Sequence, residues 1–321
     1  MVCLQEIQFN MSKFIEFIAP EGDFPVEKTV VALGVFDGVH PGHRLVIQRA
    51  RELAEQLSAR TAALTFIPHP RQVLPGGNSV KLLIPEELRV KKLLASGAER
   101  VGKINFSPEI AGWEAGYFLA QLQSCGLFQL AGICVGSCWR FGKNGSGGRE
   151  LLEEFCFQNG IAFIPVPEVV KDGQLISSSL IRQLISEGKL ADLERLTGEK
   201  AELSGSVVSG MHLAGRELAA PTANLQVEYG VLPPDGVYSG SVDIDGRDFP
   251  AVLNIGKAPT YNVSQRRVEI HLIGFEGNLY DRKLTVRLKK FLREICCFSS
   301  PVELRGQIAR DIADAVNSFA D

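Results

Sequence analysis

Two histidines with two residues between them, His40 and His43, are the first candidates for chemistry in this chain of 321 residues. They follow a short apolar run and a glycine-containing turn, and a helical pattern begins directly after them. Residues three apart in a first helical turn share one face, beside free backbone N–H groups and the positive end of the helix dipole. Such a position holds phosphate groups. The predicted phosphate site comprises Gly34, Phe36, Asp37, Gly38, His40 and His43.

The histidine pair also has simpler explanations that the sequence leaves open. Both rings could merely begin the helix, one of them as its cap, and a zinc site would lack an evident third ligand and carboxylate partner. The glycines at 34, 38 and 42 allow the backbone to approach a ligand closely. This setting favours a pair of donors to the phosphates of a nucleotide, which would stabilise the charge on a pentacoordinate phosphorus.

Three further segments of the first half carry polar side chains at predicted turns. His69 lies between two prolines after an apolar strand, where it would form a rigid turn or reach the same phosphates. The glycine-rich segment 142–148 lacks the Gly-Lys-Ser/Thr of a Walker A loop, and we interpret it as a lid. Ser177, Ser178 and Ser179 precede a helical pattern and are its cap candidates. Arg182 is then either a surface charge or a bidentate phosphate clamp.

The second half contains a possible metal ligand set and a lone carboxylate. The segment 210–216, which includes Gly215, reads as a glycine-rich flap over phosphates. Thr222 and Asn224 follow it, and their hydroxyl and amide oxygens are hard ligands for Mg²⁺, although a polar turn would explain them too. Glu269 lies within an apolar strand. In a cleft it would be the general base for a hydroxyl that attacks a γ-phosphate, and on a solvent face it would have no role.

The elements that position these residues change character along the chain. In the first part, apolar strands alternate with amphipathic helices, which predicts an α/β fold with a parallel sheet covered on both faces. Ligands of such sheets lie beyond the carboxyl ends of the strands, at the topological switch point. We therefore expect the histidine turn, the turn at His69 and the segment from Gly136 onward to converge on one crevice. The predicted strands are 30–33, 61–67, 100–106, 131–135 and 161–166, and the predicted helices are 43–60, 85–95, 107–125 and 151–158.

Two short helices, one starting at the serines and closed by Gly188 and one at 191–196, precede the second part. From about residue 203 the apolar residues alternate with a period of two between Gly, Pro and Asp turns, which predicts a small antiparallel barrel or sandwich. The alternation points Glu269 away from its apolar neighbours. A final helix from Ser300 would pack on the barrel without obvious chemistry. The domain boundary falls near residues 186–200.

Composition narrows the possible partners. Hydrophobic residues make up 45% and charged residues 22% of the chain, which is typical of a globular protein with full cores. The net charge of −3 predicts no binding to nucleic acid or to an anionic membrane, and no apolar run is long enough to span a bilayer. The seven cysteines are scattered and mostly in apolar segments, which favours reduced thiols in a cytoplasmic protein.

Several motifs occur in an order that resembles the bacterial bifunctional riboflavin kinase/FAD synthetases, over roughly residues 29 to 315. In the first half they are GVFDGVHPGH at 34–43, TFIPHP at 65–70, VG at 135–136 with FG at 141–142, and ISSSLIR at 176–182. In the second half they are GR at 215–216, PTAN at 221–224, PDGVY at 234–238, NIG at 254–256 with PT at 259–260, and VEIHL at 268–272.

The resemblance implies a Rossmann-like nucleotidyltransferase domain over 1–190 and a β-barrel riboflavin kinase domain with a C-terminal helix over 191–321. The barrel would phosphorylate the ribityl 5′-hydroxyl of riboflavin with ATP and Mg²⁺, with Glu269 as base and with Thr222 and Asn224 at the metal and phosphates. The first domain would transfer AMP from a second ATP to FMN and release pyrophosphate. Its phosphate ligands would be His40 and His43, assisted by the turn at 178–182. The resemblance implies riboflavin, FMN and ATP as partners and leaves the oligomeric state open.

One departure from the family pattern keeps alternatives open. Cys138 and Trp139 stand where the family usually has a carboxylate or amide followed by Phe. The main alternative is therefore a riboflavin kinase whose first domain has a weakened or inactive adenylyltransferase. A flavin-binding protein without turnover is a third possibility, but a sensor would need neither the base Glu269 nor the histidine phosphate donors His40 and His43.

Overall fold

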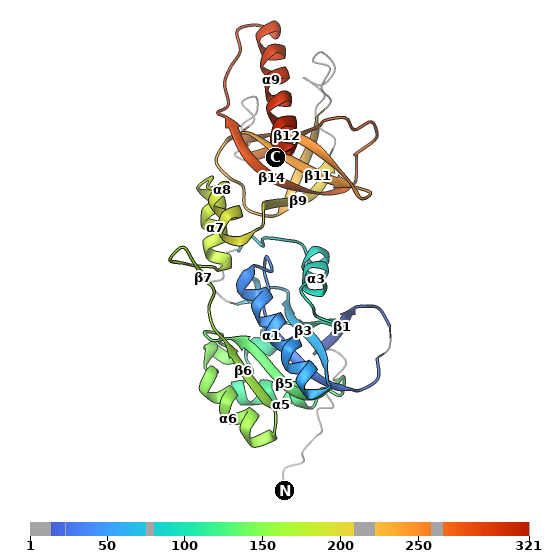
Figure 1. Ribbon diagram of the computed structural model, residues 1–321, viewed down its shortest axis with the longest axis vertical. Helices are drawn as coiled ribbons and strands as arrows, with labels where there is room; N and C mark the ends of the chain where they lie inside the picture. Colours follow the sequence, from blue (N-terminus) through green and yellow to red (C-terminus); the bar gives the residue numbers. More distant parts are fainter. Residues whose placement is uncertain (1–13, 23, 75–79, 209–221, 258–265, 321) are drawn as a thin grey trace. The chain divides into compact units, whose positions relative to one another are not determined.

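The computed structural model describes residues 14–22, 24–74, 80–208, 222–257 and 266–320. These residues form two compact units (Figure 1). Unit 1 consists of the described residues up to 80 together with 86–170, and unit 2 consists of 81–85 together with the described residues from 171 onward. Each unit is described by itself below.

Unit 1 is built on the strands β1 (Ile15–Ala19), β2 (Lys28–Gly34), β3 (Arg60–Ile67), β4 (Arg100–Asn105), β5 (Gln129–Gly136) and β6 (Ala162–Val166). They form one sheet in the order β1-β4-β3-β2-β5-β6. Strands β2 to β6 are parallel, which confirms the five predicted strands and the predicted α/β class. The edge strand β1 pairs antiparallel with β4, and no sequence pattern predicts it.

The strand order places the topological switch point between β2 and β5. From β2 the chain proceeds through β3 to β4 on one side, and β5 and β6 lie on the other side. The loops that follow β2, β3 and β5 therefore leave the same edge of the sheet side by side, as the sequence predicts. Residues 30–33 in β2 are almost completely buried, because helices cover both faces of the central strands.

The helices of unit 1 are α1 (Pro41–Leu57), α2 (Pro70–Val73), α3 (Glu86–Ala95), α4 (Pro108–Ala111), α5 (Ala115–Gln123) and α6 (Arg149–Asn159), with a 3₁₀ turn at Lys143–Gly145. Helix α1 packs on β2, β3 and β5. It buries Val46, Ile47, Ala50, Leu53 and Ala54, whose three- and four-residue spacing predicts this face.

The single helix predicted over 107–125 is wrong, because the chain forms α4 and α5 with a break between them. Ser107 caps α4 as predicted, since its Oγ accepts from the backbone N–H of Ile110. The N–H of Gly112 then bonds to the carbonyls of Pro108 and Glu109, which closes α4 after one turn. Glu114 adopts an extended conformation and starts α5. Local hydrogen bonds thus end the first helix before the apolar pattern ends.

Unit 2 contains a closed antiparallel barrel in the order β10-β13-β12-β11-β14-β9. Its strands are β9 (Ala201–Val208), β10 (Ala223–Tyr229), β11 (Gly236–Ile244), β12 (Arg247–Lys257), β13 (Arg266–Leu272) and β14 (Lys283–Arg293). Of the two predicted architectures, a barrel or a sandwich, the barrel is confirmed. The hairpin predicted at Asp245 and Gly246 joins β11 to β12, and both residues have positive φ angles of 55° and 84°.

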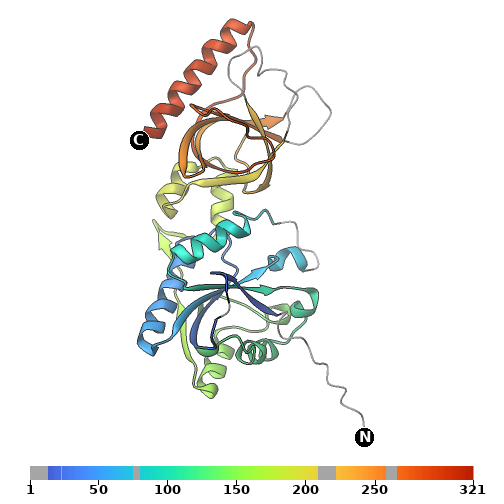
Figure 2. The ribbon, with the colours of Figure 1, turned by 90° about the vertical axis from the view of Figure 1, so that its right-hand side faces the viewer.

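Among the described residues, three helices accompany the barrel: α7 (Ser178–Ser186), α8 (Leu190–Thr197) and α9 (Pro301–Ala320). A small hairpin of β7 (Val170–Lys171) and β8 (Gln174–Leu175) precedes them. Figure 2 shows the barrel as a closed ring with α9 on its outside. Helix α9 contacts β11, β12 and β14, so the predicted packing of the final helix on the barrel is confirmed.

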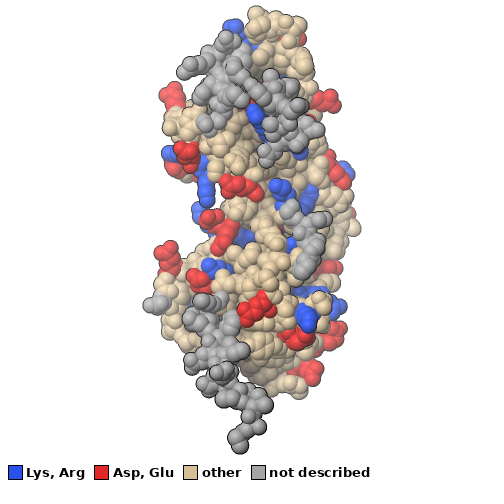
Figure 3. All heavy atoms as spheres, turned by 180° about the vertical axis from the view of Figure 1, so that it is seen from behind, with Lys and Arg blue, Asp and Glu red and all other residues tan. Residues whose placement is uncertain are grey.

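The surface carries charges of both signs. Acidic and basic side chains are interspersed over the face shown in Figure 3, which agrees with the small net charge of −3. In the part of the chain that the structure describes, no helix is both long and apolar enough to cross a membrane.

Candidate active sites

The turn after β2 has an unusual backbone that brings two rings together. Phe36 and Val39 have positive φ angles of 52° and 41°, and the N–H of Val39 bonds to the carbonyl of Phe36. A Cβ atom at position 34 would lie 2.8 Å from the Phe36 ring, so only glycine fits there. Gly38 has a φ angle of 85°, which glycine adopts freely. Phe36 and Asp37 are both buried, so this predicted phosphate-binding turn is a packed part of the fold.

His40 and His43 lie face to face at the start of α1. His40 occupies the N-cap position, but its ring makes no hydrogen bond to the helix end. The two ring centroids are 3.6 Å apart and the planes differ by 23°, while the His43 ring meets the edge of Phe36 at 5.3 Å. The structure therefore brings the two predicted histidines together beside the free N–H groups of the helix.

His43 is held in its neutral form. Burial lowers the pKa of His43 well below 6.5, and the charges of His40, Arg89 and Arg44 lower it further. Its Nδ1 atom is buried and has no hydrogen-bond partner among the described residues. A neutral imidazole can donate one N–H to a phosphate, so the positive charge of this site must come from the groups around His43, which include Arg89 and Arg44.

Arg89 is a residue of this site that the sequence reasoning missed. It comes from α3, its exposed fraction is 3%, and its Nη1 lies 3.4–3.5 Å from Val35 O, Thr65 Oγ1 and Phe66 O. These atoms mark the carboxyl ends of β2 and β3. The sequence contains only the spacing, because Arg89 lies four positions before Leu93 and therefore shares its face of the helix, which the structure shows to be buried. A charged residue on the apolar face of a helix indicates a buried partner or a ligand.

The two neighbouring loops lie at the same edge of the sheet. His69 caps α2, because its Nδ1 accepts from the Arg71 N–H at 3.1 Å, so the imidazole proton resides on Nε2. After β5, the exposed Cys138 precedes Trp139, which stacks on Phe141 with centroids 4.8 Å apart and planes within 12°. The Trp139 ring also lies 6.3 Å from that of Phe66 and 6.4 Å from that of Phe118, so Trp139 belongs to a cluster of aromatic rings.

The predicted turn at 178–182 belongs to unit 2, whereas the histidines belong to unit 1. Ser177 is the residue that caps α7, through a hydrogen bond from the Leu180 N–H to its Oγ, and Ser178 and Ser179 begin the helix. Arg182 donates from Nε to the carbonyl of Lys81 at 2.9 Å. Assistance from this turn to the histidines stays a prediction.

The candidate site of unit 2 is organised around Glu269. In β13 its side chain lies opposite Asn224 of β10 on one side and Asn254 of β12 on the other. Residues directly opposite in an antiparallel ladder project to the same face. Val268 and Ile270 are buried in the barrel, so these three polar side chains share its outer face, as the two-residue alternation predicts for Glu269.

This outer face borders a cavity of about 260 Å³. The barrel contributes its polar groups, and the segment after β14 and helix α9 contribute mostly apolar ones. Helix α9, for which the sequence shows no obvious chemistry, supplies part of the wall. The cavity is lined by Thr222, Val237, Val252, Asn254, Glu269, His271, Arg293, Ile295, Cys296, Phe298, Leu304, Ile308, Asp311 and Ile312.

The predicted residues of the second site are thus partly assembled. Thr222 and Glu269 line the same cavity, and Asn224 is in register with Glu269. The predicted flap with Gly215 lies outside the described residues. A cavity with one polar and one apolar wall suits a ligand that is partly polar and partly apolar.

Comparison with known proteins matches each half of the chain to a protein family. Residues 25–180 match the FAD synthetase family, and residues 197–319 match the riboflavin kinase family. The bifunctional riboflavin kinase/FMN adenylyltransferase of Pseudomonas fluorescens is 33% identical over 89% of this chain and 91% of its own length. The enzyme of the same name from Escherichia coli K12 is 31% identical over 96% of this chain and 98% of its own.

A solved structure is similar to this chain over most of its length. It is titled a macrolide-efflux protein from Streptococcus pneumoniae, has a TM-score of 0.80 and is 28% identical, covering 92% of this chain and 95% of its own. The match to the riboflavin kinase family includes the barrel and its cavity, and the match to the FAD synthetase family includes the histidine turn. The protein therefore has riboflavin kinase and FMN adenylyltransferase activities, and both use ATP. The chain belongs to the family of bifunctional riboflavin kinase/FMN adenylyltransferases.

Proposed function

We propose that the cavity of unit 2 is the riboflavin kinase site and that the turn after β2 is the adenylyltransferase site. The observation that carries the first assignment is Glu269 on the cavity wall, in register with two asparagines. The second rests on the stacked histidines with Arg89 at the switch point of the sheet. We place the domain boundary at residue 190, which is supported by family matches that end at 180 and begin at 197.

In the kinase reaction, Glu269 acts as general base on the ribityl 5′-hydroxyl of riboflavin. As the hydroxyl loses its proton to the carboxylate, its oxygen attacks the γ-phosphorus of ATP and the bond to ADP breaks. The apolar wall of the cavity holds the flavin ring and excludes water, which limits hydrolysis of ATP. The polar wall orients the ribityl chain, so positioning supplies much of the catalysis.

Thr222 and Asn224 fit a magnesium site of the kind that nucleotide phosphates complete. Their oxygens are hard donors, and Mg²⁺ is usually held by one or two protein groups together with substrate phosphates and water. Among the described residues, no group of three or more His, Cys, Asp or Glu side chains could hold a metal ion. The ion would neutralise charge on the phosphates of ATP. Gly215 is proposed to lie in the flap over them.

In the adenylyltransferase reaction, the groups around the histidine turn bind the phosphates of ATP. A phosphate oxygen of FMN attacks the α-phosphorus and the bond to pyrophosphate breaks, so no covalent enzyme intermediate is needed. His40 and His43 donate N–H groups, and Arg89 supplies positive charge to the phosphates. His69, with its proton on Nε2, and the turn at Ser178, Ser179 and Arg182 are further proposed phosphate ligands.

Both reactions are proposed to occur in the cytoplasm, which supplies ATP and keeps thiols reduced. Cys125, Cys134 and Cys156 are buried free thiols, and burial raises the pKa of Cys134 to about 12 and that of Cys156 to about 11. Such thiols are unreactive packing groups.

The test is to incubate the pure protein with riboflavin, ATP and Mg²⁺ and to separate the flavins by chromatography. FMN followed by FAD is expected. FMN alone would favour the alternative in which Cys138 and Trp139 have weakened the adenylyltransferase. Unchanged riboflavin would contradict the kinase assignment.

A further inference from the structure

The two walls of the unit 2 cavity are held in place in different ways. The polar wall consists of barrel strands, whose positions are fixed by continuous ladders. The apolar wall consists of α9 and the segment 294–298, which has no regular secondary structure and joins no ladder. Ile295, Cys296 and Phe298 of this segment line the cavity. Side-chain contacts must therefore determine where this wall lies.

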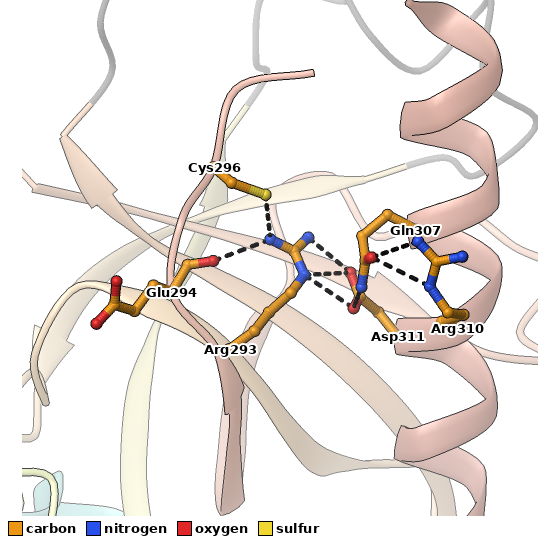
Figure 4. A network of polar contacts seen from close by, with 6 residues as sticks. All are labelled: Arg293, Glu294, Cys296, Gln307, Arg310 and Asp311. Atoms are coloured by element: carbon orange, nitrogen blue, oxygen red, sulfur yellow. Dashed lines mark hydrogen bonds and ion pairs between the residues drawn. The ribbon is translucent and has the colours of Figure 1, made fainter. Parts of the chain in front are cut away.

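One guanidinium contacts both parts of this wall. Arg293, the last residue of β14, donates from Nε to both carboxylate oxygens of Asp311 in α9, at 3.0 and 3.2 Å, and from Nη2 to Oδ2 at 2.7 Å. Its Nη1 donates to the carbonyl of Glu294 at 3.0 Å and contacts Cys296 Sγ at 3.3 Å. Figure 4 shows Arg293 between the helix and the segment, with contacts to both.

The carboxylate of Asp311, which accepts the hydrogen bonds from Arg293, is itself held in place. Asp311 is 4% exposed, and its Oδ1 also accepts from Nε2 of Gln307, one helical turn earlier, at 2.8 Å. Arg310 in turn donates to Oε1 of Gln307 from Nε and Nη2. Arg293 thus meets a carboxylate whose orientation is set by α9, so the helix and the strand end are locked in one relative position.

We propose that Arg293 is a positioning residue of the riboflavin kinase site, which holds the segment 294–298 and α9 as the wall opposite Glu269. The inference rests on the assignment of this cavity to riboflavin kinase. A buried ion pair is weak support for stability, because desolvation offsets the attraction, whereas its directional contacts specify geometry. Lysine cannot replace this function, since an ammonium group lacks the planar fork that reaches helix and segment together.

The first test compares Arg293→Lys with the matched control Arg287→Lys. Arg287 lies on the same strand and pairs with Asp248 of β12, but it does not line the cavity. Arg293→Lys should raise the KM for riboflavin about tenfold, the effect of losing one hydrogen bond between charged groups, with kcat within about threefold. Arg287→Lys should change neither constant, and both variants should form FAD from supplied FMN at the original rate.

A second readout reports the position of the wall directly. Cys296 faces the cavity, so riboflavin should protect its thiol from N-ethylmaleimide, measured by mass spectrometry in a Cys297→Ser background. The riboflavin concentration for half protection should rise about tenfold in Arg293→Lys, in parallel with KM. Asp311→Asn, which removes the charge and keeps one acceptor oxygen, should shift both measurements in the same direction.

The outcomes separate this inference from the site assignment. If riboflavin is phosphorylated with saturation but never protects Cys296, the cavity is not the kinase site and the assignment fails. If riboflavin protects Cys296 but KM and half protection stay unchanged in Arg293→Lys and Asp311→Asn, the positioning role is refuted. A fall in kcat alone would also refute it. If Arg293→Lys unfolds, Asp311→Asn decides between these outcomes.

Discussion

Replacing Arg89 tests the electrostatics of the adenylyltransferase site. Arg89→Met keeps the length and most of the volume of the side chain but removes the guanidinium, so the charge at the carboxyl ends of β2 and β3 is lost. The contacts of Nη1 with Val35, Thr65 and Phe66 are 3.4–3.5 Å long. Contacts of this length are weak, and each should contribute less than the usual net of about 1 kcal/mol per hydrogen bond.

Losing these three contacts should cost little stability, within about 2 kcal/mol, because a buried charge that costs desolvation disappears with them. The expected loss of activity is larger. Removing one group that stabilises developing charge costs roughly 10²-fold in kcat, or about 2.7 kcal/mol. Removing the charge should also raise the pKa of His43, since Arg89 is one of the charges that lower it.

The assay measures FAD formation from FMN and ATP, and FMN formation from riboflavin in the same preparation serves as an internal control. Arg51→Met, which removes an exposed arginine of α1 that pairs with Glu55, is the matched control variant. It should leave both rates unchanged. If Arg89→Met formed FAD within about threefold of the original rate while folded, Arg89 would not contact the phosphates and the reasoning would be refuted.

Two further predictions concern the histidines of unit 1. Because the pKa of His43 lies below 6.5, the unfolded state binds more protons, so the free energy of unfolding should fall as pH falls below about 6.5, by at most about 1.4 kcal/mol per pH unit from this group. Urea titrations across this range should show the slope, and His43→Gln should reduce it; an unchanged slope would contradict the assignment. The substitution His69→Ala should destabilise the protein by about 1 kcal/mol through loss of the α2 cap, whereas His69→Asn should preserve the cap. If the His69→Asn variant formed FAD at the full rate, His69 would have only the capping role.

Much of the fold follows from local patterns in the sequence. The five parallel strands are continuous apolar runs because both of their faces are buried, and the barrel strands alternate because only one face is buried. The break between α4 and α5 depends on which carbonyls the N–H of Gly112 reaches, and the apolar spacing does not contain that information. The edge strand β1 is defined by its pairing with β4, about 85 residues later, so its own sequence identifies it poorly.

In the candidate sites too, local patterns predict individual residues, but not the partners that distant parts of the chain bring to them. The period of two places Glu269 on the outer face of its strand, but the partners Asn224 and Asn254 depend on how the barrel closes. Arg89 escaped prediction because an arginine in an amphipathic helix is usually exposed. Arg293 and Asp311 are 18 residues apart, and only the packing of α9 on the barrel brings them to one cavity.

The most direct test of the account separates the two reactions with Glu269→Gln. The protein is supplied with ATP and Mg²⁺ and either riboflavin or FMN, and the flavins are resolved over time. Without the general base, FMN formation should fall by roughly 10²- to 10⁴-fold, while FAD formation from supplied FMN continues at the original rate. If both rates fell together, or if FMN formation persisted, the assignment of Glu269 as the base of a separate kinase site would be contradicted.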